Sequence, residues 1–133
     1  MADKLHFDLV SPEKRLFAGD VDMVVVPGEE GDFGVLPDHA PAMSAIRPGA
    51  ISVHNDGDVT RTFILGGFAE VTPAGLTVLA AEAIDLATID AEALAKDISY
   101  AREDVADAKT DDTREAAQAR LDRFEAIQAA LIN

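Results

Sequence analysis

The chain has 133 residues, no cysteine and a formal net charge of −14, from 25 acidic and 11 basic side chains. A chain of this length forms one domain, or a small domain with an appendage, and can bury a core without disulfides. The acidic charge disfavours nucleic acid and anionic lipid as partners. No apolar run approaches the ~18 residues that span a membrane, and the first residues lack an apolar signal-peptide region. We expect a cytoplasmic protein without direct lipid insertion.

The first 86 residues predict short β-strands. Residues 4–10 alternate apolar and polar side chains, which is typical of a half-buried strand. Further strand-like runs cover residues 16–17, 21–26, 43–46, 51–54, 59–65, 68–72 and 76–80. In the run 21–26, Val21, Met23 and Val25 are expected on the inward face. The outward positions Val24 and Val26 are also apolar, so both faces of this strand are expected to be covered. About 8–10 short strands separated by turns predict an antiparallel β-sandwich or a flattened barrel.

A stretch rich in glycine, proline and acidic residues follows the third strand. It holds Gly28, Gly31 and Gly34 at three-residue spacing, the carboxylates Glu29, Glu30 and Asp32, and Pro37 and Pro41 around His39. This composition predicts an exposed, shaped loop that contributes no core.

The histidines and acids give no pattern typical of an active site. Asp38 and His39 are adjacent in an extended segment, so their side chains are expected to point in opposite directions. The three carboxylates lack the spacing of a calcium loop, and the glycines lack the Lys and Ser or Thr of a phosphate loop. His6 and His54 have no ligand spacing and are expected at the surface. We expect no catalytic residue, no metal and no cofactor.

The pattern changes near residue 85, where glycine and proline end and alanine and charged residues dominate. Apolar residues at steps of four and three predict a helix with the stripe Leu94, Ile98, Ala101, Val105 and Ala108. Asp90 or Thr88 is the expected N-cap. We therefore expect a β-sandwich over residues 1–86 and a separate helical domain over residues 88–133.

A second helix is expected after the interruption at residues 109–112. Asp112 with Glu115 resembles a capping box. The apolar stripe that follows is Ala117, Leu121, Phe124, Ile127 or Gln128, and Leu131. So short a link predicts an antiparallel hairpin, and its alanine-rich stripes predict a weakly held element.

An ordered set of motifs in the first 85 residues resembles the epsilon subunit of bacterial F-type ATP synthases. The central match is Gly28, Glu30-Gly31, Gly34, Pro37 and His39-Ala40-Pro41. The flanking matches are Leu9-Val10-Ser11, Phe17, Ile46-x-Pro48-Gly49, Gly66-Gly67, Glu70-Val71, Pro73 and Thr77-Val78-Leu79-Ala80. Beyond residue 85 the chain matches only as a helical, alanine-rich and charged tail.

The resemblance implies a non-catalytic rotor subunit of the central stalk, which couples proton-driven rotation of a membrane ring to ATP synthesis. It implies a peripheral position at the cytoplasmic face of the bacterial membrane, held there through the complex. Contacts to the polar loops of the oligomeric proton-carrying ring are implied for Glu29, Glu30, Gly31, Asp32 and Phe33. Contacts to the gamma subunit are implied for His39, Ala40 and Pro41.

The resemblance also concerns the helical hairpin. Some family members extend it along the shaft as a brake on ATP hydrolysis, and the corresponding candidate contacts to the catalytic alpha/beta head are Arg114, Arg120 and Arg123. From Asp112 onward the chain holds these three bases and four acids, a net charge of 3 − 4 = −1, so at most weak inhibition is expected.

Some members bind ATP through Ile-Asp followed by Arg-Ala. Asp90 matches that motif, but Ala93 replaces its arginine, so no nucleotide site is expected.

Two other classes remain open from the residues alone. One is a free ligand-binding sandwich with the helices as a lid, and the other is a small hydrolase. Co-purification with a membrane-bound ATPase separates the rotor subunit from both.

Overall fold

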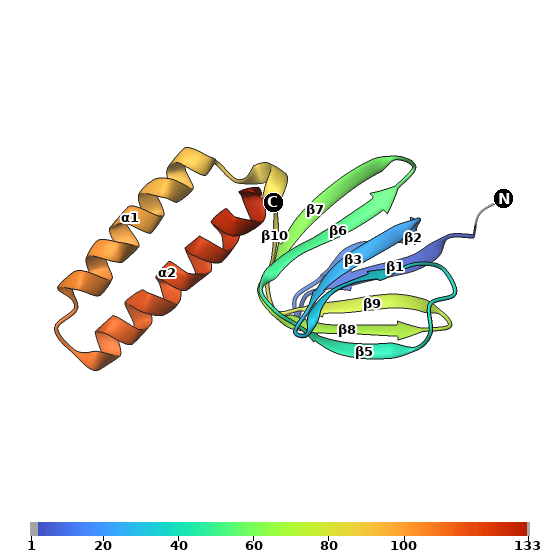
Figure 1. The fold of residues 1–133 in the computed structure, drawn as a ribbon, viewed down its shortest axis with the longest axis horizontal. Coiled ribbons are helices and arrows are strands. Elements are labelled where there is room, and N and C mark those ends of the chain that lie inside the picture. The colour runs from blue at the N-terminus through green and yellow to red at the C-terminus, as the bar shows by residue number, and fades with distance from the viewer. Residues whose placement is uncertain (1–2, 133) are drawn as a thin grey trace. The chain divides into compact units, whose positions relative to one another are not determined.

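The computed structural model describes residues 3–132 and divides by its internal contacts into two units, Met1–Asp85 and Leu86–Asn133. The first unit is a ten-stranded, mostly antiparallel sheet that folds over on itself, with β6 and β7 in one layer and β5, β8 and β9 in the other (Figure 1). The strands are β1 (Leu5–Val10), β2 (Arg15–Val21), β3 (Met23–Gly28), β4 (Gly31–Val35), β5 (Ala42–Ile46), β6 (Gly49–Asn55), β7 (Asp58–Ile64), β8 (Gly67–Thr72), β9 (Gly75–Ala80) and β10 (Ala83–Asp85).

The strands lie in the order β10-β7-β6-β3-β5-β8-β9-β1-β2, with β4 paired to β3 outside this path. The β1–β9 ladder is parallel, whereas the other ladders are antiparallel. Alternate side chains from both layers meet in one core, in which Phe7, Ile51 and Val78 have no exposed surface. The predicted sandwich is therefore confirmed.

The predicted inward face of the third strand is wrong. Val24 and Val26 are fully buried, whereas Met23 and Val25 are half-buried. The chain bends at Asp22, so Val21 belongs to β2 and its alternation does not continue into β3.

The stretch predicted as an exposed loop forms a strand hairpin instead. β3 and β4 pair from Val24 opposite Val35 to Gly28 opposite Gly31, and Glu29 and Glu30 make the turn. Val35 is fully buried in the core. The alternation of Phe33 and Val35 was the signal for this strand, and the surrounding glycines obscured it.

The second unit is an antiparallel pair of helices, α1 (Ala91–Asp107) and α2 (Asp111–Ile132), preceded by a 3-10 turn at Leu86–Thr88 (Figure 1). The Asp90 carboxylate caps α1 by accepting from the backbone N–H groups of Glu92 (2.9 Å) and Ala93 (3.2 Å). Leu94, Ile98 and Ala101 are buried, as the stripe predicts.

The second helix begins earlier than predicted. Thr110 and Thr113 cap it reciprocally, because each hydroxyl accepts from the other residue's backbone N–H, at 3.1 and 3.3 Å. Asp112 and Glu115 are therefore not the capping box. Asp111 and Asp112 lie in the first turn of α2, where a negative charge interacts favourably with the helix dipole. The buried residues of α2 are Ala117, Leu121, Ile127 and Ala130, so Ile127 rather than Gln128 lies on the buried face, while Phe124 and Leu131 are half-buried.

Candidate functional site

The turn between β3 and β4 forms an acidic tip on the sandwich, which comprises Glu29–Phe33. Glu29, Glu30, Gly31 and Asp32 are exposed, and Phe33 is half-buried against the core. Gly31 has φ of 133°, a conformation that favours glycine. A Cβ on Gly28 would lie 2.8 Å from the Gly31 carbonyl oxygen, so the two strands can approach this closely only because position 28 is glycine.

Arg47 holds this tip from the end of β5. Its guanidinium donates from Nη1 to the Gly28 carbonyl at 2.6 Å and from Nη2 to the Asp32 carboxylate at 2.5 Å. Arg47 was not among the predicted site residues, although it occupies the unspecified position of the motif Ile46-x-Pro48-Gly49. Asp32, expected to face a partner, is thus already ion-paired within the chain.

The segment before β5 places His39, Ala40 and Pro41 at the surface, with His39 half-buried. Asp38 has a positive φ of 66° and lies within a turn that is closed by the His39 N–H donating to the Leu36 carbonyl at 3.2 Å. The His39 imidazole Nδ1 lies 2.6 Å from the Ala40 carbonyl oxygen, so it donates there rather than pairing with Asp38.

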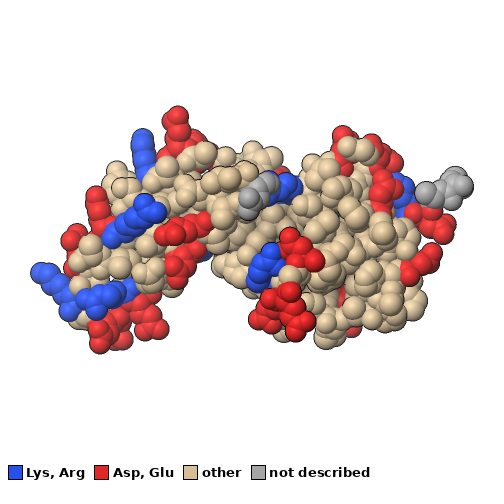
Figure 2. Space-filling model, viewed as in Figure 1, with Lys and Arg blue, Asp and Glu red and all other residues tan. Residues whose placement is uncertain are grey.

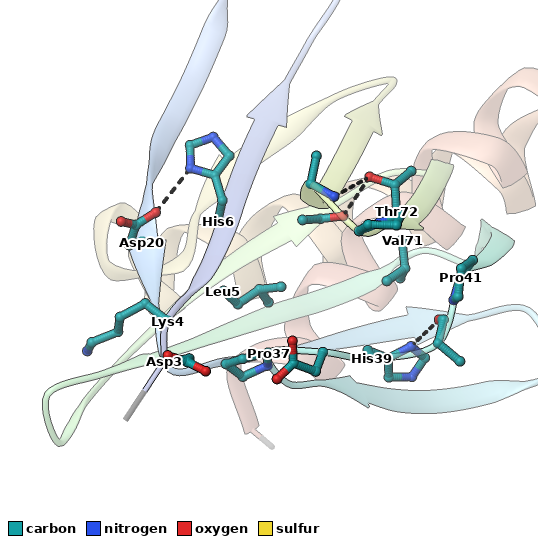
Figure 3. A pocket seen from close by; sticks show the side chains of 15 residues that line it. Asp3, Lys4, Leu5, His6, Asp20, Pro37, His39, Pro41, Val71 and Thr72 are labelled. Carbon is teal, nitrogen blue, oxygen red and sulfur yellow. Dashed lines mark hydrogen bonds and ion pairs between the residues drawn. The ribbon is translucent and has the colours of Figure 1, made fainter. Parts of the chain in front are cut away.

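An open pocket of about 630 Å³ lies beside this segment, between the start of β1 and the β8–β9 turn (Figure 3). Figure 3 shows His6 with Asp20 on one side of it and His39 with Pro41 on the other. His6 Nδ1 lies 3.1 Å from Asp20 and Nε2 lies 3.2 Å from Asp8. The hydrogen bond to Asp20 raises the pKa of His6, partly offset by burial. Across residues 3–132, no group of three or more His, Cys, Asp or Glu side chains is placed to hold a metal ion.

The outer side of β5, β8 and β9 carries exposed apolar side chains, Met43, Phe68 and Leu79, which we call the apolar face. Their exposed fractions are 69%, 57% and 55%. In the β8–β9 ladder Phe68 lies opposite Leu79. In the β5–β8 ladder Phe68 lies opposite Ala45, which is two residues from Met43 on the same strand. The neighbours Ala69 and Val78 point into the core. This face was not predicted from the sequence, because β5 becomes the neighbour of β8 only in the folded sheet.

The helical hairpin carries bases and acids intermixed on its surface (Figure 2). Arg114 pairs with Asp111 at 3.3 Å and donates to the Ala108 carbonyl at 3.2 Å. Arg120 pairs with Asp104 of the other helix at 3.1 Å, and Arg123 is half-buried. Asp90, the match to the nucleotide motif, is used as the helix cap.

None of the helices among the described residues is long and apolar enough to cross a membrane. An exposed apolar face beside an acidic tip on a β-sandwich is typical of a protein that functions through contacts with other proteins. Residues 4–86 match the family model of the β-sandwich domain of the ATP synthase delta/epsilon chain, and the chain belongs to this family.

Curated relatives extend the similarity to the helical part. The chain is 70% identical over 129 residues to an ATP synthase epsilon chain of Maricaulis maris, covering 97% of both proteins. It is 57% identical to that of Parvibaculum lavamentivorans, covering 96% of this chain and 98% of the relative. In a solved structure of the Euglena gracilis mitochondrial ATP synthase (OSCP/F1/c-ring, rotational state 1), one chain matches with a TM-score of 0.83 and 28% identity, covering 98% of this chain and 83% of that one. The resemblance inferred from the sequence motifs is thus confirmed.

Proposed function

We propose that this chain is the rotor subunit that joins the gamma subunit of the central stalk to the proton-carrying ring of an ATP synthase, at the cytoplasmic face of the membrane. The similar Euglena chain belongs to an assembly that contains a c-ring and an F1 head. Family membership favours this function over a free ligand-binding sandwich and over a small hydrolase, because the epsilon chain is a non-catalytic subunit.

The observation that carries the proposal is the apolar face. Three large apolar side chains, each more than half exposed, lie together on adjacent strands of an otherwise acidic protein. Contiguous exposed apolar surface of this kind marks a protein–protein contact. The segment His39-Ala40-Pro41 runs directly into β5, the strand that carries Met43, and is therefore close to the apolar face in the chain. We assign this combined surface to the gamma subunit.

The acidic tip is assigned to the ring. β5 begins one residue after Pro41 and ends one residue before Arg47, which holds the tip. A strand of five residues spans about 17 Å, so the two assigned contacts lie at opposite ends of one short, hydrogen-bonded element. Acidic side chains facing a basic polar loop provide register and specificity more than affinity. A rigid strand between the two contacts suits a part that passes rotation from ring to shaft.

The helical hairpin is proposed to act as a weak brake that does not respond to ATP. Two of its three candidate head contacts, Arg114 and Arg120, are engaged by carboxylates of the hairpin itself. Asp90 is committed to capping α1, and position 93 offers a methyl group where a phosphate-binding arginine is needed.

The test of the gamma contact compares two exposed apolar residues. Phe68→Ser removes the centre of the apolar face, whereas Val59→Ser removes a similarly exposed side chain, 51% accessible, on β7. We expect Phe68→Ser to weaken binding to purified gamma subunit about tenfold or more, as for a central interface aromatic. We expect Val59→Ser to bind normally, and both variants to keep the folding stability within ~0.5 kcal/mol. Equal binding by both variants would place the gamma contact elsewhere.

The ring and membrane assignment has a separate readout. Membranes that hold the complete complex are expected to retain the chain, and membranes depleted of both gamma subunit and ring are expected to lose it. Retention on depleted membranes would show direct lipid binding and contradict the proposal.

A further inference from the structure

We propose that Arg47 is a positioning residue for the acidic tip, and that Asp32 functions as the internal partner of Arg47 rather than as the charge that meets the ring. We call the Arg47–Asp32 pair, with the bond from Arg47 to the Gly28 carbonyl, the clasp. This inference rests on the proposed ring contact at Glu29–Phe33 and identifies the residues on which that contact depends.

The clasp holds both sides of the turn through one side chain, in addition to the β3–β4 ladder and the pairing of Gly28 with Ile46 of β5. Arg47 Nη1 donates to the Gly28 carbonyl on the β3 side, and Nη2 donates to Asp32 on the β4 side. Two backbone bonds support it, from Arg47 N–H to the Pro27 carbonyl at 3.0 Å and from Glu29 N–H to the Ala45 carbonyl at 2.9 Å. The end of β5 therefore holds the turn at four points.

The chemistry of arginine suits this position. Its planar fork presents two donors in fixed directions, so one side chain bonds a carbonyl and a carboxylate on opposite strands at once. A lysine ammonium is a single point charge on a flexible stem and reproduces the charge but not the fork. The turn needs this support because Gly28 and Gly31 face each other at its base and restrict the backbone little.

The clasp also divides the charges of the tip into two kinds. Three carboxylates and one guanidinium give −3 + 1 = −2 for Glu29, Glu30, Asp32 and Arg47 together. Asp32 is paired, whereas Glu29 and Glu30 are exposed and form no ion pair within the described part of the chain. Glu29 and Glu30 are thus the acids left to meet a basic partner, and the clasp sets where they point.

The experiment is a double-mutant cycle in the full chain with the variants Arg47→Gln, Asp32→Asn and their combination. In the free protein, hydrogen exchange of the amides of residues 29–33 is measured. Binding to the purified ring in detergent is measured separately. We expect both single variants to exchange about fivefold faster at the tip, the scale of losing one exposed ion pair. We expect ring binding to weaken by a similar factor, and the combined variant to be no worse than either single one, because both break the same clasp.

Three further variants separate position from charge. Arg47→Lys keeps the charge without the fork and is expected to leave tip exchange fast. Glu30→Gln is expected to leave exchange unchanged, to weaken ring binding, and to add to the effect of Arg47→Gln. Arg102→Gln, an equal charge change on the exposed surface of α1, is the control and is expected to alter neither readout.

Each contrary result has one meaning. Unchanged tip exchange in Arg47→Gln and Asp32→Asn would overturn the positioning role. A loss of ring binding on Asp32→Asn that is equally large in the Arg47→Gln background would also overturn the inference, because Asp32 would then contact the ring itself. If every clasp variant exchanges faster but all tip variants bind the ring normally, the positioning role of Arg47 stands and the proposed ring contact at this tip is wrong.

Discussion

Lys4 and Asp22 form an ion pair, with the ammonium nitrogen 2.6 Å from the carboxylate oxygen, that ties the start of β1 to the bend between β2 and β3. The same ammonium contacts Asn55 at 2.8 Å and Asp56 at 3.0 Å in the β6–β7 turn. Asp22 also accepts from the Asp56 N–H at 2.8 Å, which supports the positive φ of 54° at Asp56. One lysine thus joins three segments that are distant in the sequence.

The first prediction concerns the pH dependence of stability from this pair. Two hydrogen bonds lower the pKa of Asp22 below its ordinary value of 3.8: the larger effect comes from Lys4, and the smaller from the Asp56 N–H. The hydrogen bond to Asp22 in turn raises the pKa of Lys4 above 10.5. A lowered acid pKa gives stability that is present above 3.8 and lost as pH falls through the folded value. A raised lysine pKa gives stability that is lost as pH rises through its folded value.

Asp22→Asn is therefore expected to be less stable than the parent chain at pH 7, with the difference shrinking as pH falls below 3.8. Urea denaturation across this range measures it. Asp58→Asn, in the same hairpin and with an exposed side chain, is the matched control and is expected to show no such trend. A pH-independent difference for Asp22→Asn would mean that the ion pair is not its cause.

The second prediction concerns His6. The hydrogen bond to Asp20 is the largest cause that raises the pKa of His6 above 6.5, and Asp8 contributes less. We expect Asp20→Asn to lower the pKa of His6 more than Asp8→Asn does, as followed by NMR titration of the imidazole nitrogens. The raised pKa gives stability that is complete below 6.5 and lost as pH rises through the folded value. A larger effect of Asp8→Asn would reverse the assigned order of the two carboxylates.

The third prediction concerns the base of the acidic tip. A Cβ at Gly28 would lie 2.8 Å from the Gly31 carbonyl oxygen and 2.9 Å from the Phe33 ring, so Gly28→Ala is expected to cost about 1–3 kcal/mol of folding stability, as overpacking does. A Cβ at Gly34 meets only the Met23 sulfur at 3.6 Å, an ordinary contact. Gly34→Ala is therefore the control and is expected to change stability by less than ~1 kcal/mol. Equal denaturation midpoints for the two variants would contradict this account.

The pattern of local residues predicted the strand-and-turn order and the helical hairpin well, and it failed where distant contacts decide the structure. Alternation located the strands around the Asn55–Asp58 turn, and Asp90 was recognised as a cap because its partners are only two and three residues away. β4 was missed because glycines flank Phe33. The clasp was missed because Asp32 and Arg47 are fifteen positions apart and meet only through the β3–β5 pairing.

The fourth prediction is that residues 1–87 fold without the helices. The chain divides into two compact units after Asp85, and the sandwich has its own core of buried side chains. We expect the truncated chain to give one cooperative unfolding transition and a dispersed NMR spectrum, and to enter complexes that lack the full-length chain. An unfolded or non-binding truncation would show that the helices belong to the core unit.

The fifth prediction is that removing residues 88–133 raises ATP hydrolysis by the complex less than about tenfold, a barrier effect below ~1.4 kcal/mol. A strong brake needs a cationic surface for the acidic surface expected on the catalytic head, and α2 does not supply one. Arg114 is paired with Asp111 within α2, and Arg120 is paired with Asp104 of α1, so both charges are already compensated in the hairpin.

The measurement compares hydrolysis by complexes that hold the full chain with complexes that hold residues 1–87, matched for subunit content. Arg120→Ala in the full chain is the accompanying variant, and it is expected to change hydrolysis little, because this arginine is already paired with Asp104. Calorimetric titration of the free chain with ATP is expected to show no micromolar binding, since Ala93 offers no fork to a phosphate and Asp90 is occupied by the N–H groups of α1. A tenfold or larger rise on truncation would contradict the weak brake, whereas micromolar ATP binding would contradict only its independence from ATP.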